Sequence, residues 1–173
     1  MKLLTDIKPA HTMCRMNDLT DEQFGHWMAG FTDGEGCFYC RVSRPRRGSI
    51  SEDIEPAFSI ILRDDDLAIL EEIILRTGWK TRIQRHGAMT NRQGIRSNPR
   101  AKLEVRRALH CMEVVRFFDK FRLRAKKRND FAIWREIVIG IAQGPRGSRW
   151  GGPADRSDII SKIEQLKAGR AYK

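Results

Sequence analysis

Apolar residues recur at helical spacing in five segments of the chain and alternate with polar residues in four others. The helical pattern covers residues near 20–36, 64–77, 107–119, 131–141 and 159–166. The alternating pattern covers residues near 37–44, 54–62, 79–86 and 100–106. Because turn-forming residues separate the alternating segments in pairs, we expect two antiparallel hairpins. The predicted order is α-ββ-α-ββ-α-α-α, an α+β fold without an internal repeat.

The first predicted helix has signals at both ends. Thr20 can cap it, and Gln23 stands at the capping-box position three residues later. Apolar residues follow at helical spacing from Phe24 to Phe31, and residues 33–36 read Asp-Gly-Glu-Gly. The next helix is expected to end before Gly78, because glycine is a common stop signal.

The length of 173 residues fits one well-packed domain. Residues 1–19 have an irregular pattern and are assigned to an N-terminal arm. Residues 20–143 are assigned to the core domain, and residues 144–173 to a C-terminal loop and helix.

The net charge of +11 favours a polyanionic partner, most commonly nucleic acid. No apolar run approaches the ~18 residues of a transmembrane helix, and no basic amphipathic helix has a clean apolar face, so we expect no membrane association. The N-terminal residues lack the apolar core of a signal peptide. We therefore expect an intracellular protein, in a bacterial cytoplasm or in the stroma or matrix of an organelle.

Cys37 and Cys40 have CxxC spacing, which is typical of zinc sites and redox motifs. No second pair stands at zinc-like spacing, and the two residues point to opposite faces of the predicted strand. We expect reduced thiols that bind no metal.

The segment Met28–Gly36, MAGFTDGEG, resembles the motif that defines the LAGLIDADG homing endonuclease family. It has Met and Phe at the two Leu positions, Thr at the Ile, Gly at the second Ala and Glu at the final Asp. The αββαββα order that begins with this motif also resembles the family. The resemblance implies the LAGLIDADG homing endonuclease fold, with an antiparallel β-saddle for DNA and additional C-terminal helices.

A chain with one copy of the motif resembles the homodimeric, group I intron-encoded members of the family, whose motif helices pack together. Ala29 and Gly30 are small enough for two helix backbones to approach closely. By this resemblance we expect Trp27, Ala29, Gly30 and Asp33 at the dimer interface, Asp33 mainly closing the helix end. Two-fold pairing implies a nearly palindromic double-stranded DNA target.

The resemblance assigns Glu35 as the catalytic acid and, with the Gly34 carbonyl, as a metal ligand. Two such carboxylates would repel each other at a two-fold axis unless cations lie between them, and hard oxygen ligands select Mg²⁺ or a similar ion. We expect Mg²⁺ as the cofactor, with Mn²⁺ or Ca²⁺ able to replace it for binding. Alone, the same four residues would be typical of an acidic glycine turn, and Glu in place of Asp moves the carboxylate by one methylene.

The basic run at residues 121–128 resembles the family's basic segment after the second hairpin, where one cation approaches the cleaved phosphate. Arg124 matches that position, with Lys126 and Lys127 as rivals, and we assign Arg124 and Lys126 to catalysis. The alternative for this run is a nonspecific phosphate clamp. Relatives carry water-organising polar groups at the positions of Ser59 and Leu62, and because Leu62 is apolar we expect no side chain to act as general base.

A two-stranded ribbon can present side chains to base edges in the major groove. If the apolar strand faces pack on helices, the polar faces are either available for this role or simply solvated. The predicted base-reading residues are Tyr39, Arg41, Ser43, Asp53, Glu55, Ser59, Arg82, Gln84, His86, Arg100, Lys102 and Glu104. The arginines near the hairpin tips are expected to contact phosphates, and these are Arg44, Arg46, Arg47, Arg92 and Arg96.

These features predict a sequence-specific endonuclease that cuts both strands of a long DNA site, at an intron insertion site, as a metal-dependent homodimer. An RNA maturase or a catalytically inactive DNA-binding protein can have the same scaffold, but those proteins usually lose the acidic motif residue, and Glu35 is present here. A basic RNA- or ribosome-binding protein fits the charge but not the motif.

Overall fold

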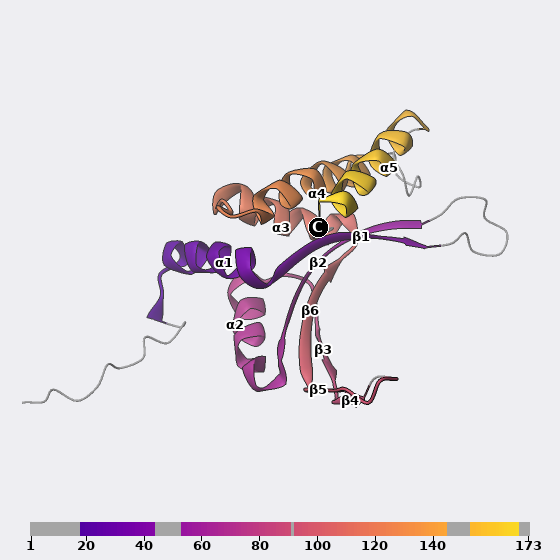
Figure 1. Cartoon of the computed structure of the whole chain (residues 1–173). Helices are drawn as coiled ribbons and strands as arrows, with labels where there is room; N and C mark the ends of the chain where they lie inside the picture. The colour runs from indigo at the N-terminus through magenta and orange to yellow at the C-terminus, as the bar shows by residue number, and fades with distance from the viewer. Residues whose placement is uncertain (1–17, 44–52, 91, 145–152, 170–173) are drawn as a thin grey trace, which may run out of the picture.

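The structure, a computed structural model, describes residues 18–43, 53–90, 92–144 and 153–169. Its elements in chain order (Figure 1) are α1 (Asp21–Glu35), β1 (Gly36–Ser43), β2 (Asp53–Arg63), the 3₁₀ turn η2 (Asp64–Asp66), α2 (Leu67–Thr77), β3 (Ile83–His86), β4 (Met89–Thr90), β5 (Arg96–Ser97), β6 (Arg100–Arg106), α3 (Ala108–Lys120), α4 (Lys127–Ala142) and α5 (Pro153–Ala168). The predicted α+β order is confirmed. The sequence pattern missed η2 and the two-residue strands β4 and β5, which pair with each other at the end of the second hairpin.

Several sequence predictions fall outside the described residues. They concern most of the N-terminal arm, including Cys14, and the connection that carries Arg44, Arg46 and Arg47. Among the described helices, none combines the length and the apolar content needed to cross a bilayer.

Four antiparallel strands form the main sheet in the order β1-β2-β6-β3. The two central strands pair over Ala57–Arg63 and Arg100–Arg106, so they join the first hairpin to the second. The helices lie on one side of this curved sheet, and its other side faces the space between the ends of the two hairpins (Figure 1). We call this uncovered side the open face.

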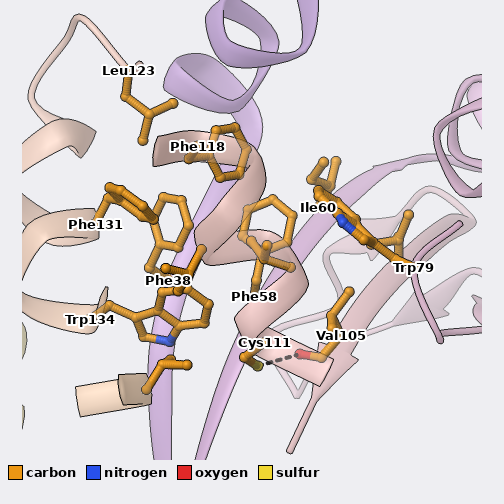
Figure 2. Close-up of a cluster of buried hydrophobic side chains, with 14 of the residues drawn as sticks. Phe38, Phe58, Ile60, Trp79, Val105, Cys111, Phe118, Leu123, Phe131 and Trp134 are labelled. Carbon is orange, nitrogen blue, oxygen red and sulfur yellow. Dashed lines mark hydrogen bonds between the residues drawn. The ribbon is translucent and has the colours of Figure 1, made fainter. Parts of the chain in front are cut away.

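Aromatic side chains fill the layer between the sheet and the helices (Figure 2). Phe38 and Phe58, from adjacent strands, are both fully buried, with ring centroids 5.0 Å apart. The Trp134 ring of α4 lies 5.2 Å from Phe38, and its indole N–H donates to the Tyr39 carbonyl at 3.2 Å. Burying such side chains stabilises a fold by roughly 1.5–3 kcal/mol each, so this cluster holds α4 on β1.

Helix α1 begins and ends as its sequence predicts. The Thr20 hydroxyl accepts from the Gln23 amide, and the Gln23 side chain accepts from the Thr20 amide, which completes the capping box. The helix passes directly into β1 at Gly36, where a Cβ atom would lie only 2.8 Å from the Thr32 carbonyl oxygen. Glycine is therefore the residue that this tight junction admits. Gly78 ends α2 in the left-handed conformation with φ of 65°, which confirms the predicted glycine stop.

Gly25 allows α1 to pack closely on the segment after α3, because a Cβ at this position would overlap the Phe121 ring. Phe121 is itself buried, so its ring has little room to move. We expect Gly25→Ala to lower the free energy of unfolding by about 1–3 kcal/mol, the usual cost of overpacking. Urea denaturation followed by circular dichroism measures this.

Gly140→Ala is the matched control, because it also adds a methyl group to a glycine within a helix, and this glycine is half-buried. A Cβ there would lie at an ordinary 3.7 Å from Ile159 Cδ1. Helix propensity should make Gly140→Ala neutral or stabilising by up to ~1 kcal/mol. Equal losses in the two variants would contradict the packing argument.

Candidate functional site

The end of α1 carries the acidic motif residue at the surface. Glu35 is the last residue of the helix and is exposed, as is Gly34 beside it. The next residue pairs with Ile60 of β2, so Glu35 lies at the edge of the sheet where β1 begins. The carboxylate thus belongs to the last turn of α1.

Asp33 connects the motif to the basic segment. One of its carboxylate oxygens accepts from the backbone amides of Arg124 and Ala125, at 2.8 and 3.0 Å. The other oxygen is buried and has no hydrogen-bond partner among the described residues. A carboxylate that accepts two backbone N–H groups fixes the path of the chain, so Asp33 sets the position of the loop before α4.

Lys127 reaches the motif most directly of the three basic candidates. Its ammonium group donates to the Gly34 carbonyl oxygen at 3.3 Å. Lys126 and Lys127 also line a pocket of about 290 Å³ beside Asp33 and Cys37, whereas the exposed Arg124 does not line it. Helix α4 begins at Lys127, four residues before the predicted helix, so the last two residues of the basic run are helical.

The oxygen donors at the motif fit part of a divalent cation site. Glu35 is exposed and offers a carboxylate, and Gly34 offers the carbonyl that accepts from Lys127, both of the hard oxygen type that Mg²⁺ prefers. Within the described part of one chain, no three His, Cys, Asp or Glu side chains gather to hold a metal. A complete coordination shell at Glu35 thus needs further oxygen atoms, from a second copy of the chain, from water or from a phosphate.

The exposed face of α1 contains the small residues Gly30 and Gly34, one helical turn apart. Apart from the neighbouring backbone of α1 itself, no atom of the described chain lies within 4 Å of a Cβ built at either position, so another helix can approach here. Trp27 is half-buried and stacks on Phe31, with centroids 4.9 Å apart. Ala29, predicted at the same interface, is only 4% exposed because it faces the chain's own core, and its side chain is absent from this surface.

The open face of the sheet carries the side chains that alternation predicted to point away from the helices. Across its strands, the register aligns Tyr39 with Ala57, Ser59 with Glu104, and Gln84 with Lys102. Of the predicted base-reading residues, Ser59 and Glu104 are buried within this face. The others whose exposure the structure describes are half-buried or exposed, and they are Tyr39, Arg41, Ser43, Glu55, Arg82, Gln84, His86, Arg100 and Lys102. Asp53 is the first residue of β2 and pairs with Ser43.

The sequence interpretation did not include three residues of the open face, of which Arg63 lies one residue past the predicted strand and the other two lie within predicted strands. Ile61 and Arg63 follow Ser59 on the same side of β2, and Arg106 follows Glu104 on β6. Ile61 is 43% exposed, an apolar side chain on a largely polar surface. Leu62 points the other way, into the core. Continuing the alternation by two steps from Ser59 and by one step from Glu104 would have found all three.

A basic pocket of about 410 Å³ lies where β3 begins and β6 ends. Its lining includes Lys80, Arg82, Arg106, Arg107 and His110. Arg107 stands just before α3 with a positive φ of 69°, the one such non-glycine residue in the described chain. No local pattern in the sequence indicated this cluster, since its members come from two strand ends and a helix. At the far end of the second hairpin, Arg92 and Arg96 are exposed as predicted.

Glu104 is the buried carboxylate of the open face, with its side chain only 1% exposed. Tyr39 and Lys102 donate hydrogen bonds to its Oε1 atom, and Arg41 donates to the same oxygen at 2.8 Å. Burial alone would raise the pKa of Glu104, but the hydrogen bonds from Lys102 and Tyr39, with the charges of Lys102 and Arg41, outweigh it and lower the pKa. The carboxylate therefore stays ionised at neutral pH.

Comparison with known proteins identifies relatives of this arrangement. The sequence profile described as LAGLIDADG endonuclease matches residues 28–138. Among solved structures, the chain is similar to the homing endonuclease I-TnaI, with a TM-score of 0.60 and 27% identity over 87% of this chain and 95% of that one. No curated protein matches the chain.

Two DNA-bound structures share the fold at lower identity. The LAGLIDADG homing endonuclease I-LtrWI bound to target DNA has a TM-score of 0.68 and 16% identity, covering 94% of this chain and 48% of that one. The LAGLIDADG homing endonuclease I-GzeII in complex with its DNA target has a TM-score of 0.63 and 22% identity, covering 83% and 43%. The chain thus spans less than half the length of these two, but nearly all of I-TnaI.

The contact of Asp33 with the basic segment is testable by substitution. Asp33→Ala should release the amides of Arg124 and Ala125, and we expect a loss of about 1.5–3 kcal/mol in stability, as for hydrogen bonds to a charged group. Amide hydrogen exchange at these two positions should accelerate. Asp33→Asn keeps an oxygen acceptor and should lose less stability than Asp33→Ala.

Glu22→Ala is the control, because Glu22 is an exposed acid at the other end of the same helix. The loss of stability in Glu22→Ala should stay below about 1 kcal/mol, which is the usual effect of a charge near a helix end. Unchanged exchange at residues 124 and 125 in Asp33→Ala would show that the contact does not hold the loop.

Proposed function

Because the chain belongs to the LAGLIDADG endonuclease family, we propose that it is a sequence-specific enzyme that hydrolyses phosphodiester bonds in both strands of a DNA target. The observation that carries this proposal is the exposed Glu35 at the edge of the open face. A duplex bound on the open face would bring its backbone to this acid, and Lys126 and Lys127 line the pocket beside the motif. An inactive DNA-binding protein or a maturase would need the scaffold but not this acid.

We propose that the active form is a homodimer. The chain covers 95% of I-TnaI but less than half of I-LtrWI and I-GzeII, as expected if two copies of it correspond to one of the longer chains. The exposed Gly30 and Gly34 on α1 leave room for a second motif helix. Two-fold pairing through this face would place two Glu35 carboxylates near each other and imply a nearly palindromic target, which we place at an intron insertion site.

Glu35 and the Gly34 carbonyl are the groups that would hold a divalent cation, Mg²⁺ in this proposal. When bound, such a cation neutralises the reacting phosphate and makes water a better nucleophile. Lys127 lies against Gly34 and Lys126 lines the same pocket, so their positive charges are available to a phosphate at the motif. The structure favours these two lysines over Arg124 for that role. Leu62 faces the core and Ser59 is buried, so neither offers a general base.

The open face would read the bases in the major groove. Its exposed cations suit guanine, Gln84 suits adenine, and Ile61 can contact a thymine methyl group. The basic pocket around Lys80 and Arg107, together with Arg92 and Arg96 at the hairpin end, would bind phosphates and fix the register on the duplex.

Glu35→Gln should abolish cleavage while leaving DNA binding in place, because it removes the charge that holds the cation but changes no packing. We expect at least a 10²-fold lower single-turnover rate with Mg²⁺ on a plasmid carrying a site selected from a randomised palindromic library. Binding with Ca²⁺ should change by less than threefold. Glu22→Gln on the same helix is the control, and retained cleavage by Glu35→Gln would refute the assignment of Glu35.

Gly30→Leu should block association of the motif helices, since the added side chain would occupy the space between them, and its Cβ would meet no atom outside the neighbouring backbone of α1. Sedimentation velocity should show a monomer where the wild type is a dimer, with the circular dichroism spectrum unchanged. Gly87→Leu adds the same side chain at another open, exposed glycine and should remain dimeric. A dimeric Gly30→Leu protein would place the interface elsewhere.

A further inference from the structure

The middle of the open face contains a cluster in which one carboxylate binds three donors from two strands. Tyr39 and Arg41 come from β1, and Lys102 and Glu104 come from β6. The Lys102 ammonium and the Arg41 guanidinium also donate to the Tyr39 hydroxyl, at 3.2 and 3.4 Å. The four side chains are therefore one connected hydrogen-bonded unit, which we call the Glu104 cluster.

The cluster depends on two small residues of the strand between β1 and β6. The register pairs Tyr39 with Ala57, and pairs Ser59 with Glu104. Tyr39 must therefore extend across β2 to reach Glu104. Ala57 and Ser59 leave room for this crossing and are themselves covered, at 0% and 3% exposure. Large side chains at these two positions would separate the cluster residues of β1 from those of β6.

Stability alone is a poor reason for this arrangement. A buried carboxylate loses its hydration. The ion pairs that compensate for this loss often stabilise a protein no more than apolar residues of the same size would. The Oε2 atom of Glu104 is buried and has no hydrogen bond within the described residues, and Arg106 Nε lies 4.0 Å from it. The hydrogen bonds to Glu104 thus concentrate on Oε1, the oxygen that holds Tyr39, Arg41 and Lys102.

We propose that Glu104 is a positioning residue for DNA recognition, which fixes Arg41, Lys102 and Tyr39 as one rigid donor array beneath adjacent base pairs. This inference rests on the proposed DNA-binding role of the open face. A free lysine or arginine binds any phosphate, whereas a cation held by a carboxylate presents its remaining N–H groups in one direction. Glu104 would therefore reduce attraction to arbitrary DNA while sharpening the choice of bases.

The test is the substitution Glu104→Gln, which keeps the size and the carbonyl acceptor but removes the charge. Fluorescence anisotropy with Ca²⁺ compares a duplex selected for binding from a randomised library with a scrambled duplex, over a range of salt concentrations. We expect tighter binding of the scrambled duplex, by about threefold, and a ratio of scrambled to selected Kd that falls at least tenfold. The slope of log Kd against log salt concentration should steepen by the equivalent of about one to two phosphate contacts, because Arg41 and Lys102 are released.

Glu113→Gln is the matched control, because it makes the same charge change on an exposed helix position paired with Arg116. It should leave the selectivity ratio within twofold. Tyr39→Phe keeps every charge and removes one donor to Glu104, so it should also lower selectivity without steepening the salt dependence. This second variant keeps the test decisive if Glu104→Gln does not fold.

Two outcomes would overturn the inference. Parallel weakening of both duplexes, together with a lower melting temperature, would make Glu104 a purely structural residue. Loss of preference at a single base pair, with all others unchanged, would mean that Glu104 reads a base itself. Failure of the proposed function has a separate signature, since wild-type protein would then show no sequence preference in the initial selection.

Discussion

The pleat of the four-stranded sheet places alternate side chains on opposite sides, and burying one of those sides under helices is the constraint on which the rest of the structure depends. Phe38, Phe58 and Trp134 satisfy it by forming a continuous aromatic layer. Once that side is buried, a shift of one residue in β1 or β2 would expose Phe38 or Phe58 to water. The polar side chains are consequently fixed on the open face, where a duplex can reach them.

The candidate active site depends on a second constraint, the junction between α1 and the segment before α4. Asp33 binds two backbone amides of that segment, and Lys127 contacts the Gly34 carbonyl in return. These contacts join residues that are about ninety positions apart in the sequence. They hold the lysines beside the motif while leaving Glu35 itself exposed.

Local signals in the sequence were sufficient to predict the main helices and strands, and to predict which side of the sheet each strand residue faces. The capping box at Thr20, the stop at Gly78 and the alternation of β6 all depend on near neighbours, and the structure bears them out. Properties that depend on distant neighbours were not accessible in this way. The burial of Glu104 follows from a register with Ser59 and from Tyr39 two strands away. Likewise, the inward orientation of Ala29 depends on how α1 rotates against its own core.

The junction at Gly36 has a mechanical consequence. Helix α1 and strand β1 meet without an intervening loop, and the Thr32 carbonyl leaves no room for a side chain between them. There is thus no hinge to absorb a displacement of the helix. A tilt that another molecule imposes on α1 would therefore also move β1, which is the first strand of the open face.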